Sequence, residues 1–234
     1  MNTTVIRQYS YPRTKHMKGS PGATPDDIIS TEDDWIIPFL NKEIILSEKL
    51  DGENTSITNQ SVYARSKYPS INPWSVNIRE LFPYVKDYIS DDEIIFGENL
   101  YAIHSIEYNR LPSYFHMFAV FNTDRNVWYS WDDVKMFADM LDLPTVPVLF
   151  RGTISSEKEL MDMINSFMSK PSTYGVEKEG VVMRLAGEIK PEDWNNSVAK
   201  WVRANHVRTG KRWEDHWKEA KLNSIQLKNG NTLS

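Results

Sequence analysis

A lysine, an aspartate and a glycine lie within four residues of one another in the stretch LSEKLDGENTSI, residues 46–57. The lysine, Lys49, ends an apolar run that reads as a strand, and Asp51 and Gly52 follow it directly. A lysine amine is a nucleophile only without its proton, and a free lysine with a pKa of ~10.4 is almost fully protonated at neutral pH. Nearby cations, a bound metal and partial desolvation would favour the neutral amine. The chain contains no cysteine, so thiol nucleophiles, disulfides and Cys-ligated zinc sites are excluded.

Further charged and aromatic residues follow Lys49 along the chain, each on or beside a predicted strand. They lie in the segments YARS, IIFGEN, FHMFAV, EKEGVVMR and SVAKWVRAN. A single Lys-x-Asp-Gly motif arises by chance too often to indicate a function, whereas the ordered set is far more specific. The candidates in this set are two cations, two carboxylates and one phenylalanine: Arg65, Glu98, Phe118, Glu179 and Lys200.

This order of motifs resembles the lysine-adenylating nucleotidyltransferase superfamily of polynucleotide ligases and capping enzymes. The segments YPRTKH, KLDGEN with Asn54, and VAKWVRANHV are most similar to ATP-dependent RNA ligases of the RNA ligase 2 type. The resemblance covers the chain from about Arg7 to about Val207. It implies an α+β fold, a nucleotidyltransferase (ATP-grasp-like) domain of mainly antiparallel sheets flanked by helices.

The resemblance assigns nucleotide-binding roles to individual residues. Lys49 corresponds to the nucleophile that attacks the α-phosphate of ATP and carries AMP as a covalent intermediate. Asn54 belongs to the matching KLDGEN motif, and Arg65 is expected to contact ribose and phosphate through its fork of donors. Phe118 is expected to stack on adenine. The family often has an acid after this phenylalanine, where Ala119 stands in this chain.

The resemblance also implies a metal site and a cationic phosphate site. Asp51, Glu98 and Glu179 would supply the oxygen environment that Mg²⁺ or Mn²⁺ prefers, through the waters that the ion retains, with Glu98 also holding a ribose hydroxyl. Lys200 would bind the α-phosphate, so the expected catalytic residues are these four and Lys49. Arg203 is the next cation, and on a regular strand it points away from the face of Lys200. Either a bulge brings it in or the second phosphate contact comes from elsewhere.

The elements that must position these residues are strands with helices between them. Alternating or apolar runs predict strands over 43–49, 55–66, 93–99, 114–122, 180–186 and 197–203. Capping-box spacing predicts helices over 130–143 and 156–170, and a third helical segment, 74–89, is expected to be broken by Pro83. Strands and helices do not alternate strictly, which independently favours an α+β fold with mainly antiparallel sheet.

We expect one domain over residues 1–234, with an irregular arm at 1–34 and a short, basic, Trp-containing extension at 204–234. The extension is too short for a separate OB-fold domain. Trp213 and Trp217 would share a face of a terminal helix that either docks on the domain or stacks on bases. His104 is interpreted either as a structural histidine or as a residue beside the site.

The function implied is an ATP-dependent RNA ligase that joins 5′-phosphate and 3′-hydroxyl ends, with RNA as its partner. The alternatives are a small ATP-dependent DNA ligase, a capping enzyme, or a noncatalytic nucleotide- or RNA-binding protein on the same fold. The formal net charge of -5 argues against nonspecific coating of nucleic acid. Without a signal peptide or an apolar run of membrane length, the chain is expected to be soluble and cytoplasmic, and to be a monomer.

Overall fold

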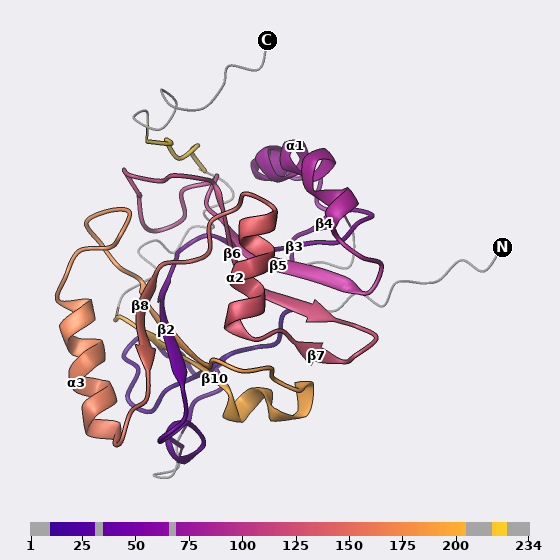
Figure 1. Cartoon of the computed structure of the whole chain (residues 1–234). Helices are drawn as coiled ribbons and strands as arrows, with labels where there is room; N and C mark the ends of the chain where they lie inside the picture. Colours follow the sequence, from indigo (N-terminus) through magenta and orange to yellow (C-terminus); the bar gives the residue numbers. More distant parts are fainter. Residues whose placement is uncertain (1–9, 31–34, 66–68, 205–216, 224–234) are drawn as a thin grey trace.

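Two five-stranded sheets form the framework of the molecule. The computed structural model describes residues 10–30, 35–65, 69–204 and 217–223. The first sheet has the strand order β1 (Lys15–His16), β10 (Val198–Val202), β9 (Gly180–Leu185), β2 (Ile44–Lys49) and β8 (Val148–Gly152). The second has the order β4 (Val62–Tyr63), β3 (Glu53–Ile57), β5 (Glu93–Asn99), β6 (Phe115–Asn122) and β7 (Val127–Trp128). Figure 1 shows the first sheet at the lower left and the second at the right.

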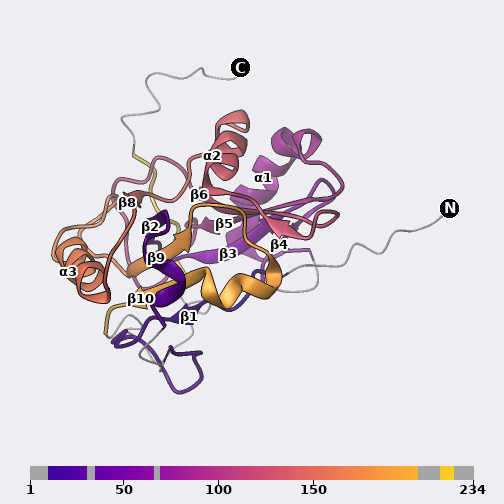
Figure 2. The same ribbon diagram turned by 60° about the horizontal axis from the view of Figure 1, so that its bottom comes forward.

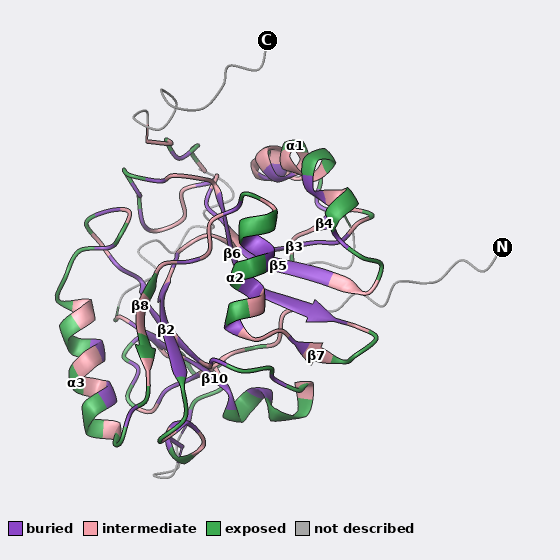
Figure 3. Cartoon of the chain, viewed as in Figure 1, coloured by how far each residue is buried: buried purple, intermediate pink, exposed green. Residues whose placement is uncertain are grey.

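Nearly all neighbouring strands run antiparallel, which confirms the predicted α+β class with mainly antiparallel sheet. The exception within the named strands is β1, which pairs parallel with β10 and lies beside it in Figure 2. The central strands are the most buried, as the purple colour of β2, β5 and β6 shows in Figure 3. The β-branched residues of β2 and β5 suit this pleated, buried environment.

Three α-helices cover the outer faces of the sheets. The residues of α1 (Val76–Val85) and α2 (Trp131–Met140) join the core of the second sheet, whereas α3 (Glu157–Met168) packs on the first. Both predicted helix starts are confirmed, because the Ser130 and Ser156 hydroxyls accept the backbone N–H groups of Asp133 and Glu159. The described residues also form four short 3-10 helices: η1 (Ile37–Phe39), η2 (Pro73–Ser75), η3 (Lys86–Tyr88) and η4 (Pro191–Asn196).

The expected break at Pro83 is wrong, because α1 continues through Pro83 and ends at Val85. A proline this close to the carboxyl end removes one hydrogen bond without preventing the final turn. The arm at 1–34 is also not wholly irregular, since it contributes β1. Strands β7 and β8 were not predicted; β7 has only two residues, and the residues of β8 are exposed or only partly buried.

The connection from Lys49 to Glu53 carries the chain from the first sheet to the second. Its Gly52 fits closely against the second sheet: a Cβ at this position would lie 2.5 Å from the carbonyl oxygen of Asn99. A larger residue would therefore disturb the packing of this connection against the end of β5. The motif that contains the candidate nucleophile is thus the joint between the two sheets.

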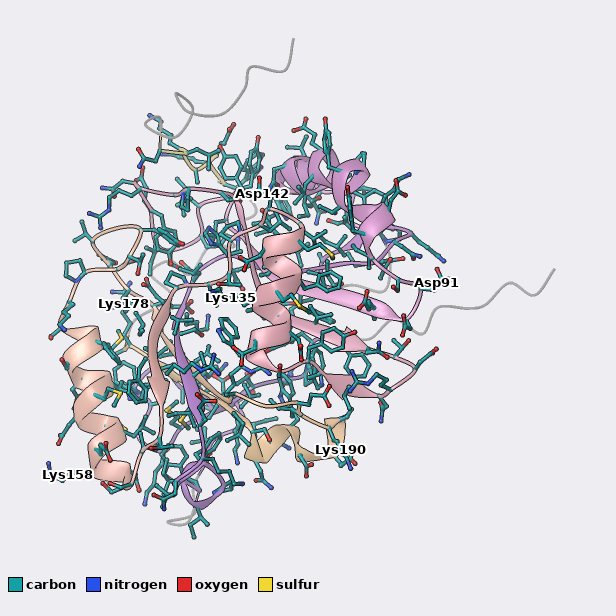
Figure 4. All side chains as sticks on the ribbon, viewed as in Figure 1. Asp91, Lys135, Asp142, Lys158, Lys178 and Lys190 are labelled. Atoms are coloured by element: carbon teal, nitrogen blue, oxygen red, sulfur yellow. The ribbon has the colours of Figure 1, made fainter. Side chains whose placement is uncertain are left out.

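The outside of the molecule is polar, and its charged side chains, such as Lys158 on α3 and Lys190 before η4, point outward (Figure 4). The segment 217–223 is extended and pairs with the loop after β5, where the Ala220 N–H donates to the carbonyl of Tyr101 at 2.8 Å. Trp217 packs against Trp74, with 6.2 Å between the ring centroids, and Trp213 lies outside the described residues. None of the helices within the described ranges has both the length and the apolar character needed to span a bilayer.

Candidate active site

A cavity of about 290 Å³ lies between the two sheets. The first sheet contributes side chains from β2, β9 and β10, and the second contributes them from β3, β5, β6 and β7. Six of the nine predicted site residues line it: Lys49, Asn54, Arg65, Glu98, Phe118 and Lys200. Residues from distant parts of the sequence therefore meet in one place because the two sheets face each other.

The Lys49 amine projects into this cavity and donates a 2.5 Å hydrogen bond to Oε2 of Glu179. The two residues are neighbours because Lys49 at the end of β2 pairs with Gly180 at the start of β9. Gly180 has no room for a side chain, since a Cβ there would lie 2.1 Å from the carbonyl oxygen of Trp201. The close packing of β9 on β10 holds the carboxylate beside the amine.

The electrostatics of Lys49 are set by carboxylates rather than by cations. Burial lowers the pKa of Lys49, but the charges of Glu179, Glu98 and Asp51 and the hydrogen bond to Glu179 outweigh it, so the pKa is raised. Burial raises the pKa of Glu98 to about 8, and the charge of Lys49 opposes this only in part. The expectation of a neutral amine therefore does not hold for the chain without ligand. Lys49 is a protonated amine until neighbouring negative charge is neutralised.

The three predicted metal carboxylates are close to Lys49 but have different partners. Oδ2 of Asp51 accepts the backbone N–H groups of Ser105 and Ile106 at 2.7 and 2.8 Å. Oε1 of Glu98 accepts the Gly52 N–H at 3.1 Å. Across the described ranges, no three acidic or histidine side chains form a group that could hold a metal ion directly. The expected arrangement, in which the three carboxylates face the cation through its retained waters, stays a prediction. One oxygen of Asp51 already holds the loop at 105–106.

Lys200 lies on β10 beside Val182 and reaches the cavity from the first sheet. Its amine donates to Oδ1 of Asp27 at 3.4 Å, and the His16 ring lies 3.4 Å from the same oxygen. Burial lowers the pKa of Lys200 against the opposing charge of Asp27. The amine of Lys200, which was expected to bind phosphate, is thus bonded to the carboxylate of Asp27 from the amino-terminal arm.

Arg203 does not reach the cavity. Strand β10 pairs with β9 in regular register, without the bulge that would turn Arg203 inward. Its Nη2 donates to Glu177 at 2.8 Å instead, so the predicted nucleotide contact of Arg203 is not supported. His104 lies near Asp51 and Lys49, whose charges act on its pKa, but burial has the larger effect and lowers that pKa. It does not line the cavity.

Sequence reasoning missed the aromatic end of the cavity. Tyr11 from the arm lines it, and its ring lies 5.0 Å from the ring of Phe118 in an edge-to-face contact. Three tryptophans, from β7, α2 and η4, also line it: Trp128, Trp131 and Trp194. Arg184 on β9 is buried among them. The sequence did contain a signal for Arg184. Side chains two residues apart on a strand point to the same face, so Arg184 points to the cavity with Val182.

The RNA ligase family model matches residues 42–202 of this chain. No curated protein sequence matches it. Among solved structures, an archaeal ATP-dependent RNA ligase is similar with a TM-score of 0.57 and 16% identity, over 83% of this chain and 48% of that one. A Naegleria gruberi RNA ligase variant with ATP and Mn is similar with a TM-score of 0.53 and 15% identity, over 72% of this chain and 51% of that one.

A candidate ATP-dependent DNA ligase from Aquifex aeolicus is also similar, with a TM-score of 0.54 and 17% identity, over 84% of this chain and 50% of that one. The chain spans about half the length of the solved proteins that it matches. At such identities the structural likeness shows a shared fold. The family model extends from two residues before β2 to the last residue of β10, and so includes every predicted site residue except Arg203.

Proposed function

This chain belongs to the RNA ligase family, and we propose that it is an ATP-dependent enzyme that joins a 5′-phosphate end of RNA to a 3′-hydroxyl end. The observation that carries this proposal is the position of the Lys49 amine, which projects into a cavity that Glu98 and Lys200 also line. A nucleophile, a carboxylate and a cation for phosphate thereby share one site. Phe118 adds an aromatic surface on which a base can stack.

The proposed reaction has three phosphoryl transfers. The deprotonated Lys49 amine attacks the α-phosphorus of ATP, a P–N bond forms, and the bond to the departing pyrophosphate breaks. An oxygen of the RNA 5′-phosphate then displaces Lys49, which takes up a proton, and AMP becomes linked to the RNA end through a pyrophosphate bond. Finally the 3′-hydroxyl loses its proton, attacks the 5′-phosphorus and releases AMP. Positioning and charge stabilisation account for most of the catalysis in such steps.

Two ion pairs must open before the first transfer. The Lys49 amine is held by Glu179, and the Lys200 amine is held by Asp27. When the triphosphate enters, its oxygens can replace Asp27 as the partner of Lys200. Glu179 orients the Lys49 amine toward the cavity until the proton leaves. We infer that the site without nucleotide is held in a closed, charge-paired state by its own carboxylates.

We propose Mg²⁺ or Mn²⁺ as the accompanying cation, in line with the Mn in the similar Naegleria gruberi structure. The carboxyl groups of Glu98 and Glu179 beside Lys49 fit a divalent cation that keeps most of its waters, and such a cation would favour the ionised form of Glu98 over the neutral form that burial favours. Asp51 fits less well as a direct ligand, since one of its oxygens is already bonded to two backbone N–H groups. Such a cation supplies positive charge that offsets the charge of the phosphates.

Transfer of label from α-labelled ATP to the protein tests the nucleophile. The Lys49→Ala variant is expected to form no covalent nucleotide adduct, whereas Lys42→Ala, which removes an exposed lysine just before β2, should form it normally. An adduct on the Lys49→Ala variant would show that the nucleophile is another residue. Nucleotide binding by the unaltered chain without any adduct would instead indicate a noncatalytic binding protein.

A DNA ligase is the second candidate, because the candidate ATP-dependent DNA ligase from Aquifex aeolicus shares the fold. Nicked duplexes with RNA or DNA on each side of the break, and single-stranded RNA, separate the two. Sealing that requires RNA at the 3′-hydroxyl side supports the RNA ligase. Equal sealing of all-DNA nicks would favour the DNA ligase, and labelling by GTP rather than ATP would indicate a capping enzyme.

A further inference from the structure

Strand β1 of the amino-terminal arm places His16 directly beside Lys200 (Figure 2). His16 pairs with Lys200 in the parallel register of β1 and β10, so the two side chains point to the same face of the first sheet. Lys200 lines the cavity on this face, and so does Thr14, which comes just before β1. The imidazole of His16 therefore lies on the cavity side of the sheet, next to the amine that is expected to bind phosphate.

His16 and Lys200 share one carboxylate oxygen. Nε2 of His16 and Nζ of Lys200 each lie 3.4 Å from Oδ1 of Asp27. The other oxygen, Oδ2, accepts the backbone N–H and the hydroxyl of Thr24 at 3.0 and 2.9 Å. Burial raises the pKa of Asp27, but the hydrogen bonds from Thr24 and the charges of Lys200 and His16 lower it to about 2. A negatively charged oxygen thus lies within reach of both an imidazole and an amine.

The hydrogen bonds around the imidazole of His16 decide which of its nitrogens donates. The Ser20 hydroxyl accepts the backbone N–H of Val202 at 2.9 Å, and its oxygen lies 2.8 Å from Nδ1 of His16, to which it can donate its own proton. A lone pair on Nε2 would face the Asp27 carboxylate and be repelled by it, so the ring proton belongs on Nε2. Nε2 therefore presents an N–H to the place where the Asp27 oxygen lies.

The two donors at this place are held more firmly than the carboxylate is. His16 is only 1% exposed, and its neighbour Met17 donates its backbone N–H to the carbonyl of Lys200 at 2.8 Å. The side chain of Asp27 is 29% exposed, and the residues on either side of it, 24–26 and 28–29, are exposed. Rotation of the Asp27 side chain into solvent would therefore leave a fixed pair of donors for another anion.

A phosphate is the anion that suits this pair of donors. Phosphate oxygens bind best where several charged or N–H donors converge. The next cation along β10, Arg203, is bonded to Glu177 and does not reach the cavity. The neighbouring strand β1 supplies the donor that β10 itself does not.

We propose that His16 is the second phosphate-binding residue of the site, where its Nε2–H donates to the same α-phosphate group that Lys200 binds. The phosphate takes the place of the Asp27 carboxylate, which until then keeps both donors in position. The inference rests on the proposed function, because it takes the α-phosphate of ATP to lie at Lys200.

Binding of AMP and of adenosine, measured by isothermal titration calorimetry, tests the role of Asp27. The two ligands differ only in the phosphate, so the ratio of their affinities reports the phosphate contact alone. Asp27→Ala removes the competing carboxylate and should bind AMP about 10-fold more tightly, with adenosine binding unchanged. Asp26→Ala is the matched control, because it removes the same charge from an exposed neighbour, and it should bind AMP like the unaltered chain. Weaker binding of AMP and adenosine alike by Asp27→Ala would show that Asp27 only supports the arm, and would overturn the inference.

Two substitutions of His16 with the same amide chemistry test the imidazole. Both are made in the Asp27→Ala chain, so that no carboxylate competes with AMP. The longer His16→Gln carries its amide N–H near the position of Nε2 and should keep the preference for AMP over adenosine. The shorter His16→Asn reaches only the position of Nδ1, and this preference should fall about 10-fold while adenosine binds as before. An equal preference in the two variants, or a loss for AMP and adenosine together, would overturn the role of His16.

Other outcomes separate the inference from the function on which it rests. If the unaltered chain forms the covalent nucleotide adduct but its preference for AMP responds to neither Asp27 nor His16, only the inference is wrong. If the expected AMP pattern appears without any adduct, the ligase function is wrong and the phosphate site stands. Tighter binding of 5′-phosphorylated RNA by Asp27→Ala, with AMP binding unchanged, would assign the donors to the RNA end and overturn the assignment to the α-phosphate.

Discussion

Replacing Glu98 with glutamine is expected to stabilise the folded chain, increasingly so as the pH rises. The pKa of Glu98 is about 8 in the folded chain, because burial disfavours the charged carboxylate, against an ordinary value of 4.5. Because the folded chain binds this proton more tightly than the unfolded chain does, the proton stabilises the fold. This stabilisation is complete below about pH 4.5 and is lost as the pH rises through about 8. Glutamine imitates the uncharged carboxyl and can still accept the Gly52 N–H, so the variant keeps this contribution at every pH.

The magnitude follows from the two pKa values. At ~1.36 kcal/mol for each tenfold change in proton affinity, the full difference corresponds to about 5 kcal/mol at pH 9. Solvent reaches part of the side chain and screens the charge, so about 2–3 kcal/mol is the realistic gain. For a chain of this size, that is a rise in Tm of roughly 5–10 °C.

Thermal unfolding at pH 5, 7 and 9, followed by circular dichroism, measures this difference. The control is Glu192→Gln, which neutralises an exposed carboxylate on η4 and should give a Tm difference that barely changes with pH. A Glu98→Gln difference that is constant from pH 5 to pH 9, or that shrinks as the pH rises, would refute the reasoning.

Three further substitutions test packing and placement. Gly180→Ala should destabilise the fold by about 3 kcal/mol in urea unfolding, because its methyl group would lie 2.1 Å from the Trp201 carbonyl oxygen. The control is Gly187→Ala, which has open space around the new methyl group and should unfold like the unaltered chain. Pro83→Ala should raise the stability of α1 by about 1–3 kcal/mol by restoring a helix hydrogen bond, and an unchanged urea midpoint would contradict this. Arg203→Ala should leave the rate of nucleotide adduct formation within about twofold of the unaltered chain, since the side chain lies outside the cavity. A large loss of that rate in a rapid-quench assay would show that Arg203 acts in the site.

The parts of the fold that the sequence predicts well are those with a strong local pattern. The runs that became β2 and β5 are rich in β-branched and apolar residues, and the capping serines of α2 and α3 mark where these helices begin. β1 and β7 have only two residues each, so they carry no measurable periodicity and exist because a neighbouring strand pairs with them.

The candidate site shows the same division. Lys49, Glu98 and Lys200 could be predicted to meet because their motifs resemble a known family in order and spacing, and the structure places them together. The partners of Asp51 and of Arg203 could not be predicted, since hydrogen bonds to a distant loop or to Glu177 depend on how the chain returns in space. Arg184 was missed because a strand arginine is ordinarily a surface residue.

The parallel pairing of β1 with β10 has a consequence for how the chain is made. Lys15 lies opposite Ala199, so two strands from opposite ends of the sequence must meet before this wall of the cavity exists. On the ribosome, β1 leaves the exit tunnel before β10 and cannot pair with it until all the residues between them have been synthesised. Contacts so distant in sequence form slowly, because a very long loop must close first. A nascent chain therefore cannot form the complete nucleotide cavity until β10 has emerged, and capture of a nucleotide by stalled chains of increasing length would report when folding is complete.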